Sequence, residues 1–279
     1  MAFKTILVSL NDVARSQAMI DAAAMLADLH GAHLIGCYVI PAITIYPEVG
    51  FAAASAVDDA RQRYFKSNLE EVRERFESKL RQDGINGEWR AVESLYPAIA
   101  PSVLDNGRST DLIMVSQVAG SPVSNIEDDV VERLVMESGR PVLVIPQDTD
   151  LRKVDSAVVG FNASKEAARA WFESIPLLQG ASDVRVVWVD PYKERGLAGE
   201  IPGAEVTVAL ARHGVKATAE SLTAGNMSAG QALLLHVNDL GAQLLVMGAY
   251  AHSRLREYVF GGATRYVLEH ATVPVLMSH

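Results

Sequence analysis

Cysteine is nearly absent from this sequence, and long apolar runs are absent altogether. Cys37 is the only cysteine among 279 residues, which excludes an internal disulfide and a zinc site built on several cysteines. No stretch reaches the roughly 18 consecutive apolar residues of a membrane-spanning helix. The first apolar run ends at Asn11 and is too short for a secretory signal. We therefore expect a soluble protein in a reducing compartment, most simply the cytoplasm.

Positive charge is also scarce. Lys and Arg total 25 against 34 Asp and Glu, so the net charge is −9. An acidic chain is poorly suited to coating nucleic acid or an anionic membrane, and neither is expected as a partner. Hydrophobic residues make up 49% and charged residues 21%, which is typical of a globular protein. The length predicts two small domains or one large one.

Several catalytic signatures are missing as well. The sequence has no G-x-x-x-x-G-K-[ST] phosphate loop, no G-x-G-x-x-G after its first strand, no G-x-S-x-G elbow and no H-E-x-x-H. These absences weigh against an ordinary kinase, dehydrogenase, esterase or zinc protease. No residue pattern supplies an evident nucleophile, catalytic base or metal cage.

One pattern occurs twice along the chain. Each copy opens on an apolar run followed by a polar turn and an Ala-rich helix, and each closes on a Pro-Val-Leu run. The matching segments are KTILVSL at 4–10 and DSAVVGF at 155–161, DLIMVS at 111–116 and QLLVMG at 243–248, and PVLV at 141–144 and PVLM at 274–277. The repeat predicts two domains, 1–147 and 151–279.

Within each copy, short apolar runs alternate with amphipathic segments, which predicts alternating strands and helices. In the first copy strands are expected near 4–10, 33–40, 87–93, 111–116 and 141–146, and helices near 13–29, 56–82, 97–107 and 124–138. In the second, strands are expected near 155–161, 184–190, 215–223, 243–248 and 273–277, and helices near 164–178, 203–213, 228–240 and 262–270. The fold class is therefore α/β, with two tandem doubly wound, five-stranded parallel-sheet sandwiches.

The segment GAYAHSRLREYVFGGAT at 248–264 is the strongest candidate for a ligand loop. It follows the fourth strand of the second copy, at the edge where open α/β sheets bind ligands. Gly248, Gly261 and Gly262 let backbone N–H groups approach an anion. A helix that starts there adds free N–H groups and the positive end of its dipole. The alternative is an ordinary loop in which the glycine pair makes a turn.

Polar side chains near this edge are candidates for further contacts. Arg254 or Arg256 would supply positive charge for a phosphate, and His252 lies in the same loop. Asn162 follows Gly160 at the end of the second copy's first strand. Its amide both donates and accepts, as recognition of an adenine edge requires. An Asx turn explains Asn162 equally well.

The duplicated pattern, the Pro-Val-Leu last strand and the segment at 248–277 resemble the universal stress protein family, in particular its tandem-domain members. The resemblance covers the whole chain and is most specific in 248–277. It implies the adenine nucleotide α-hydrolase-like fold. It also implies a stress-response regulator or interaction module that binds ATP, with or without Mg²⁺, and has at most slow ATP hydrolysis.

Members of that family that bind ATP carry Gly, two residues, Gly, nine residues, and then Gly followed by Ser or Thr. Gly248 and Gly261 match this pattern, whereas Ala251 takes the second Gly position and Gly262 the Ser/Thr position. Ala251 adds a methyl near the ribose, and Gly262 removes a hydroxyl that would bond a phosphate. Together these departures should weaken the affinity about 10- to 1,000-fold.

The resemblance assigns three further positions in the second copy. Thr264 matches a Thr often found two residues beyond the Ser/Thr position. Asn162 corresponds to the acidic residue that contacts adenine, and Val189 to the residue that packs on adenine at the end of the second strand.

The first copy lacks this arrangement. Its fourth strand runs into QVAGSP at 117–122, without spaced glycines. Ser124 and Glu127 fit a capping box at the start of the next helix, and three carboxylates there would repel a triphosphate. We therefore expect the first copy to be degenerate and to bind no nucleotide.

The leading hypothesis is a stress-response protein whose second domain binds ATP or a related adenine nucleotide. The alternative is an interaction protein with both sites degenerate, and an enzyme acting on an adenylated substrate is a third possibility. A protein partner is expected, its identity open. The two halves are expected to pack as an intramolecular pseudo-dimer, and a homodimer of whole chains remains open.

Overall fold

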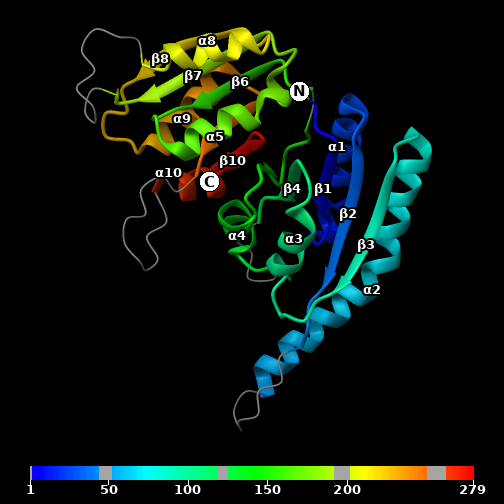
Figure 1. The fold of residues 1–279 in the computed structure, drawn as a ribbon. Helices are drawn as coiled ribbons and strands as arrows, with labels where there is room; N and C mark the ends of the chain where they lie inside the picture. The colour runs from blue at the N-terminus through cyan, green and yellow to red at the C-terminus, as the bar shows by residue number, and fades with distance from the viewer. Residues whose placement is uncertain (1, 44–51, 119–124, 152, 192–201, 250–261) are drawn as a thin grey trace. The chain divides into compact units, whose positions relative to one another are not determined.

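The structure is a computed structural model that describes residues 2–43, 52–118, 125–151, 153–191, 202–249 and 262–279. The described chain forms two compact units, Ala2–Arg140 and Pro141–His279. In each unit a largely parallel sheet lies between two layers of helices, as Figure 1 shows. The predicted tandem, doubly wound α/β fold is confirmed.

Four parallel strands form the sheet of Ala2–Arg140, in the order β3-β2-β1-β4. They are β1 (Thr5–Ser9), β2 (His33–Ile40), β3 (Gly87–Glu93) and β4 (Leu112–Ser116). The helices are η1 (Val13–Arg15), α1 (Ser16–His30), α2 (Ala52–Asp83), α3 (Ala100–Gly107) and α4 (Val130–Glu137). The first three strands are added outward from β1 to β3, and β4 is then added on the other side of β1. For this reason α1 and α2 pack together on one face of the sheet, and α3 and α4 pack on the other.

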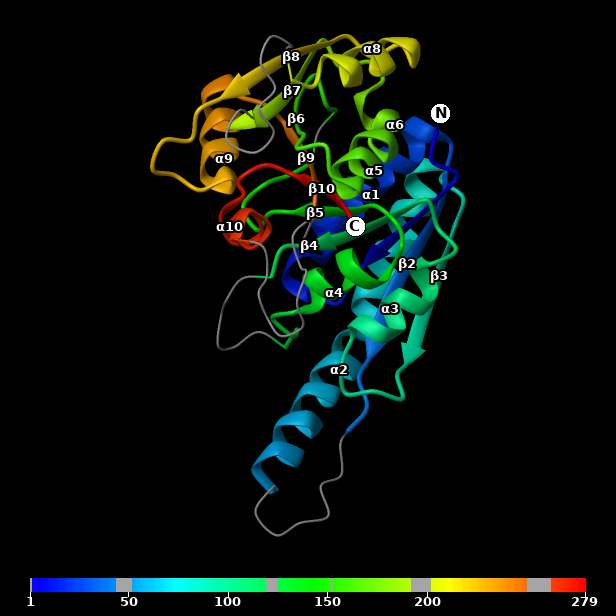
Figure 2. The same cartoon turned by 60° about the vertical axis from the view of Figure 1, so that its left-hand side comes forward.

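Pro141–His279 has the strand order β5-β10-β9-β6-β7-β8. Its strands are β5 (Val142–Ile145), β6 (Ser156–Gly160), β7 (Asp183–Val189), β8 (Ala217–Leu222), β9 (Leu244–Gly248) and β10 (Val275–Ser278). Its helices are α5 (Lys165–Glu173), α6 (Ile175–Leu178), α8 (Ala204–Arg212), α9 (Ala229–Leu240) and α10 (Gly262–His270). Figure 2 shows α9 and α10 on the face of this sheet away from α5.

β5 closes the first copy of the sequence repeat, as predicted, and it also pairs antiparallel with β10, Val144 opposite Val275. All four β5 residues are at most 2% exposed, so this apolar strand is buried on both faces.

The cores are built on the central strands. Ile6, Leu7 and Val8 of β1 have no exposed surface, and β6 is similarly buried. The long helix α2 contributes Phe65 and Phe76, both fully buried. Tyr38 donates its hydroxyl to the Phe65 carbonyl oxygen at 2.9 Å, which ties α2 to β2. Among the described residues, no helix combines the length and apolarity needed to cross a membrane.

His30 predicts a pH dependence of stability. Its ring packs edge-on against Phe3 at 5.0 Å between centroids, and its Nε2 is buried without a partner among the described residues. Burial, with a smaller contribution from the N-terminal charge, holds the pKa of His30 below its usual value. Below about pH 6.5 the unfolded chain binds a proton that the folded chain does not. The free energy of unfolding should therefore fall as the pH falls from 6.5, measured by urea titration. His30→Phe should lose less stability over the same range, and equal losses would contradict this account.

Candidate functional site

The candidate site lies at the carboxyl end of β6. The chain runs from β6 outward through β7 and β8, and then returns to β9 on the other side of β6. Gly160 is paired with Val187 on one side and with Met247 on the other. The loops after β6 and β9 thus leave the sheet at a switch in strand order, the place where open α/β sheets bind ligands.

Beyond this point β7 presents a free backbone edge. Phe161 donates its N–H to the Val187 carbonyl at 2.9 Å, and Asp190 donates its N–H to Leu222 of β8 at 2.8 Å. Because successive residues of a strand point their polar groups to opposite sides, Val189 directs its N–H and C=O toward β6, which has ended. These two groups have no partner in the described part of the chain, and Val189 is only partly buried.

The turn after β6 lies beside this edge. Asn162 accepts a hydrogen bond at Oδ1 from the Ser164 N–H at 3.2 Å, so the Asx turn weighed above is present. Ser164 in turn caps α5 by accepting the Ala167 N–H at 3.1 Å. The Asn162 amide keeps its NH₂ group without a partner among the described residues. Together Asn162 and Val189 offer donors and an acceptor at one edge.

Backbone strain is concentrated at the same place. Ala163, with φ 55°, and Asp190, with φ 49°, are the non-glycine residues with positive φ in the described chain. Ala163 follows β6 and Asp190 follows β7. Asp190 also accepts the Ala224 N–H at Oδ1, at 3.2 Å, which anchors the loop after β8. Such strain clusters at functional sites because the surrounding structure must hold it in place.

Gly248 has a packing role that requires no ligand. A Cβ at this position would lie 2.3 Å from the Ala167 nitrogen, in the first turn of α5. Glycine therefore lets the end of β9 touch the start of α5. Gly160 is less constrained, since its added Cβ would lie 3.2 Å from Leu233.

The start of α10 holds two more of the predicted residues. Gly262 begins the helix, and a Cβ there would meet nothing within 4 Å. Thr264 is 3% exposed and already has an interaction within the chain. Gly230 of α9 supports this helix end, because an added Cβ would lie 2.7 Å from the Ala263 carbonyl oxygen. The remaining predicted residues lie outside the described residues: Ala251, His252, Arg254, Arg256 and Gly261.

Sequence inspection missed Glu166 at this edge. Its side chain is almost fully buried in the first turn of α5, with Lys165 Nζ 3.3 Å from its carboxylate. Burial raises the pKa of Glu166, but hydrogen bonds from its own backbone and from Lys165 outweigh it, so the pKa lies below the usual value. The carboxylate is therefore ionised at neutral pH. No sequence signal separated Glu166 from other first-turn acids.

The corresponding edge of the first unit is filled by its own side chains. Ser116, at the end of β4, donates its hydroxyl to Asp12 Oδ2 at 2.9 Å. Glu127 pairs with Arg61 of α2 and accepts the Ile99 N–H at 3.1 Å. The predicted capping box is wrong for Glu127, because α4 begins at Val130 and the Glu127 carboxylate binds Arg61 instead. Ser124 lies outside the described residues.

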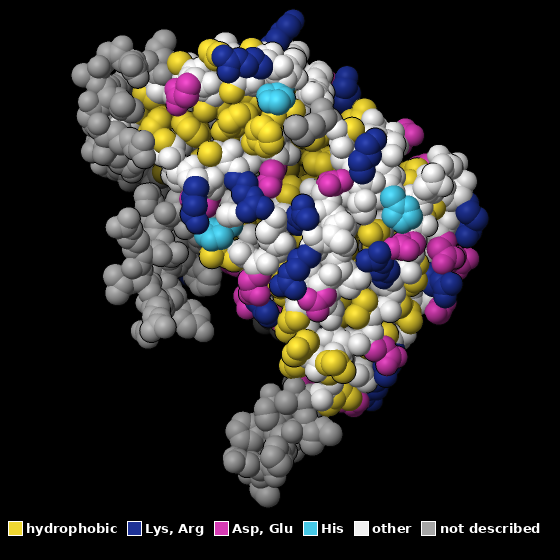
Figure 3. Space-filling model, viewed as in Figure 1, with side chains coloured by type: hydrophobic (Ala, Val, Ile, Leu, Met, Phe, Trp, Pro, Cys, Tyr) yellow, Lys and Arg dark blue, Asp and Glu magenta, His cyan; other side chains and the backbone are white. Residues whose placement is uncertain are grey.

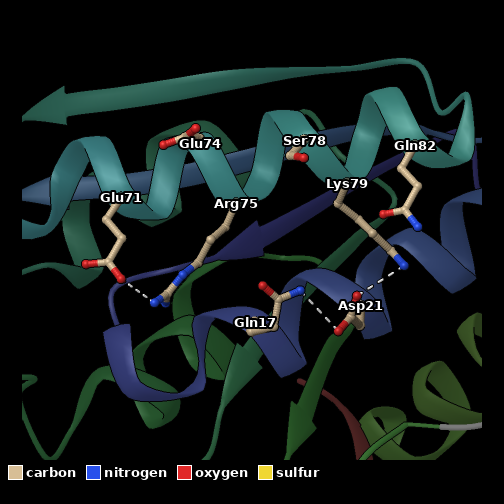
Figure 4. A pocket seen from close by; sticks show the side chains of 8 residues that line it. All are labelled: Gln17, Asp21, Glu71, Glu74, Arg75, Ser78, Lys79 and Gln82. Carbon is tan, nitrogen blue, oxygen red and sulfur yellow. Dashed lines mark hydrogen bonds and ion pairs between the residues drawn. The ribbon is translucent and has the colours of Figure 1, made fainter.

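A cleft of about 360 Å³ lies between α1 and α2. Figure 4 shows its walls, which carry charges of both signs. Lys79 is 3.1 Å from Asp21 and from Asp83, and Arg75 pairs with Glu71 and donates to Ser16 at 2.9 Å. These charges satisfy one another, so the cleft is a solvated seam between two helices.

Exposed apolar side chains occur in the second unit. Phe172 of α5 is 43% exposed and Val208 of α8 is 53% exposed. Figure 3 shows hydrophobic side chains gathered on the side of this unit that faces the viewer. Such a patch is a candidate surface for the expected protein partner, which stays a prediction.

The comparisons with known proteins agree with this architecture. Residues 158–279 match the model of the Universal stress protein family. The matched segment, residues 158–279, is a universal stress protein domain. Among solved structures, a universal stress protein from Archaeoglobus fulgidus DSM 4304 is similar over 98% of this chain and 97% of its own, with 16% identity and a TM-score of 0.68. A functionally unknown protein from Pseudomonas aeruginosa PAO1 is similar over 99% of this chain and 92% of its own, with 16% identity and a TM-score of 0.58. No curated protein matches the sequence. The structural likeness shows that the universal stress protein fold extends over both halves.

Ala163→Gly should stabilise the protein. An Ala in the left-handed conformation costs about 1–2 kcal/mol. Gly removes that cost but loses more conformational entropy on folding, about 0.5–1 kcal/mol. The free energy of unfolding should therefore rise by about 0.5–1 kcal/mol, measured in urea. Gly31→Ala is the matched control, because Gly31 has φ 61° and open space around it, and it should lose about 1 kcal/mol. A loss of stability in Ala163→Gly would contradict the strain at this turn.

Gly248→Ala and Gly262→Ala should differ sharply. The first places a methyl against the backbone of α5 and should lower the free energy of unfolding by about 1–3 kcal/mol. The second meets open space and should leave stability unchanged or slightly higher. Equal effects in thermal unfolding would contradict the packing role of Gly248.

Proposed function

We propose that the second domain binds an adenine nucleotide at the carboxyl edge of β6 and β7, and that the protein acts as a stress-response binding or regulatory protein. The observation that carries this proposal is the open N–H and C=O pair of Val189. Adenine presents a ring-nitrogen acceptor beside an amino donor, which complements that pair. Guanine presents the opposite polarity on the same edge, so this geometry favours adenine.

Neighbouring groups support the same ligand. The unpaired NH₂ of Asn162 provides a second donor at the edge. α10 starts at Gly262, within the Gly248–Thr264 segment, and helix N-termini favour phosphate groups. Arg254, His252 and Gly261 are proposed to complete the phosphate contacts. Gly262 departs from the family pattern by lacking a hydroxyl, and the open space at this position would admit one.

ATP is the proposed ligand, accompanied by Mg²⁺ bound to its phosphates. Among the described residues, no group of three His, Cys, Asp or Glu side chains is placed to hold a metal ion. The ion is proposed to be held mainly by the phosphate oxygens of the nucleotide. The described groups at this edge, the Val189 backbone and the Asn162 amide, are hydrogen-bonding groups, as a binding role requires.

The first domain is proposed to bind no nucleotide. The Arg61–Glu127 ion pair and the Ser116–Asp12 hydrogen bond occupy its carboxyl edge. A ligand at this edge would compete with these contacts, and removing one partner of the partly buried ion pair would leave the other charge uncompensated.

Thermal unfolding with and without Mg-ATP tests the proposed site. ATP at about 100 times its dissociation constant should raise the free energy of unfolding by about 2.7 kcal/mol, and GTP at the same concentration should have a smaller effect. Gly261→Glu should abolish the ATP response. Absence of any shift at millimolar ATP would overturn the proposed function in favour of an interaction protein with both sites degenerate.

Gly262→Ser should strengthen ATP binding. The added hydroxyl has space at the start of α10 and should gain about 0.5–1.5 kcal/mol from a phosphate contact, about a 2- to 10-fold lower Kd for ATP by calorimetry. Its affinity for adenosine should not change, because adenosine lacks phosphate. Gly262→Ala is the control for a gain that comes from helix stability alone. An equal gain for adenosine would show that the hydroxyl does not reach phosphate.

A further inference from the structure

The two domains carry an asparagine at the same place. Ser9 of β1 is paired with Cys37, and Gly160 of β6 is paired with Val187. Counting two residues onward from each pair gives Asn11 with Val39 in the first domain. The same count gives Asn162 with Val189 in the second. The two asparagines therefore stand at equivalent positions beside equivalent backbone edges.

The contacts at these two edges are different. Asn11 donates its Nδ2 to the Val39 carbonyl oxygen at 2.7 Å, and its Oδ1 accepts the Val39 N–H at 3.0 Å. Both polar groups of the Val39 edge are thus occupied by one side-chain amide. Asn11 is 3% exposed and Val39 is fully buried. Val189 is partly exposed and has neither bond, because Asn162 bonds Ser164 instead.

The backbone that follows each asparagine explains the difference. Asp12 has φ −78° and leads directly into η1, which leaves Asn11 turned toward β2. Ala163 has φ 55° and brings the Ser164 N–H back to the Asn162 oxygen. The Asn162 oxygen is thus used by Ser164, so the Val189 N–H lacks the acceptor that Asn11 supplies to Val39 in the first domain.

We propose that Asn11 is an internal ligand of the Val39 edge, and that it restricts the chain to one base-binding edge, that of Val189. The amide of Asn11 supplies an acceptor and a donor side by side, the pattern that adenine would supply at Val189. This inference rests on the proposed function for the role of Val189. The occupancy of Val39 is a separate claim with its own test.

Amide hydrogen exchange and NMR signals of Val39 and Val189 test the inference in the full-length chain. In the unmodified protein, adenine should move the Val189 signal and leave the Val39 signal in place. In Asn11→Ala, exchange at the Val39 amide should accelerate about tenfold or more, as expected for loss of its partner. Formamide, which matches the group removed, should shift the Val39 signal and slow its exchange, below concentrations that unfold the protein.

Asn11→Leu is the matched control, because it has nearly the same size and cannot supply the amide. Formamide should not restore protection at Val39 in this variant. If Asn11→Ala does not fold, Asn11→Ser provides a smaller side chain with the same expected response.

A Val39 amide that stays protected in the truncated variant, or does not respond to formamide, would overturn the inference. An adenine shift at Val39 of the unmodified protein would overturn it as well. If adenine does not move the Val189 signal of the unmodified protein, but formamide acts on Val39 of Asn11→Ala as expected, the proposed function alone is refuted.

Discussion

The structure depends on how backbone polar groups are satisfied where the central strand of each sheet ends. Parallel strands satisfy one another's N–H and C=O groups only where both are present. β1 and β6 stop before their neighbours β2 and β7, so the next polar groups of those neighbours need another partner. A buried group left unpaired is costly. Each domain meets this requirement differently.

In the first domain the partner is a side chain of the domain itself. Asn11 pairs with both groups of Val39 and is buried with them. The Arg61–Glu127 pair adds further internal contacts at the same edge. A domain closed in this way gains stability and specificity of packing but has no free edge. In the second domain Val189 is partly exposed, and at the Ala163 turn the Asn162 oxygen accepts the Ser164 N–H instead.

Packing constraints hold the second edge in position. Gly248 brings the end of β9 against the start of α5, and Gly230 brings α9 against the start of α10. These contacts fix two helix N-termini relative to the strand ends. The glycines that look like phosphate-loop residues in the sequence therefore include one that packing alone requires. A glycine in such a motif indicates a close approach of backbones, whether to a ligand or to another helix.

The sequence by itself determined the architecture. Repeated apolar runs, each followed by a helical pattern, predicted β2, β3 and α10 with their observed bounds, because hydrophobic periodicity is a local property. It also located the edge, through Gly248 and Asn162. Three features required the tertiary structure: the pairing of β5 with β10, the ion pair that takes Glu127 from its predicted cap, and the opposite roles of Asn11 and Asn162. Each depends on groups that are brought together across the sheet. In the last case an asparagine stands at the same repeat position in both domains, and the φ angle of the residue that follows it decides which group its side chain binds.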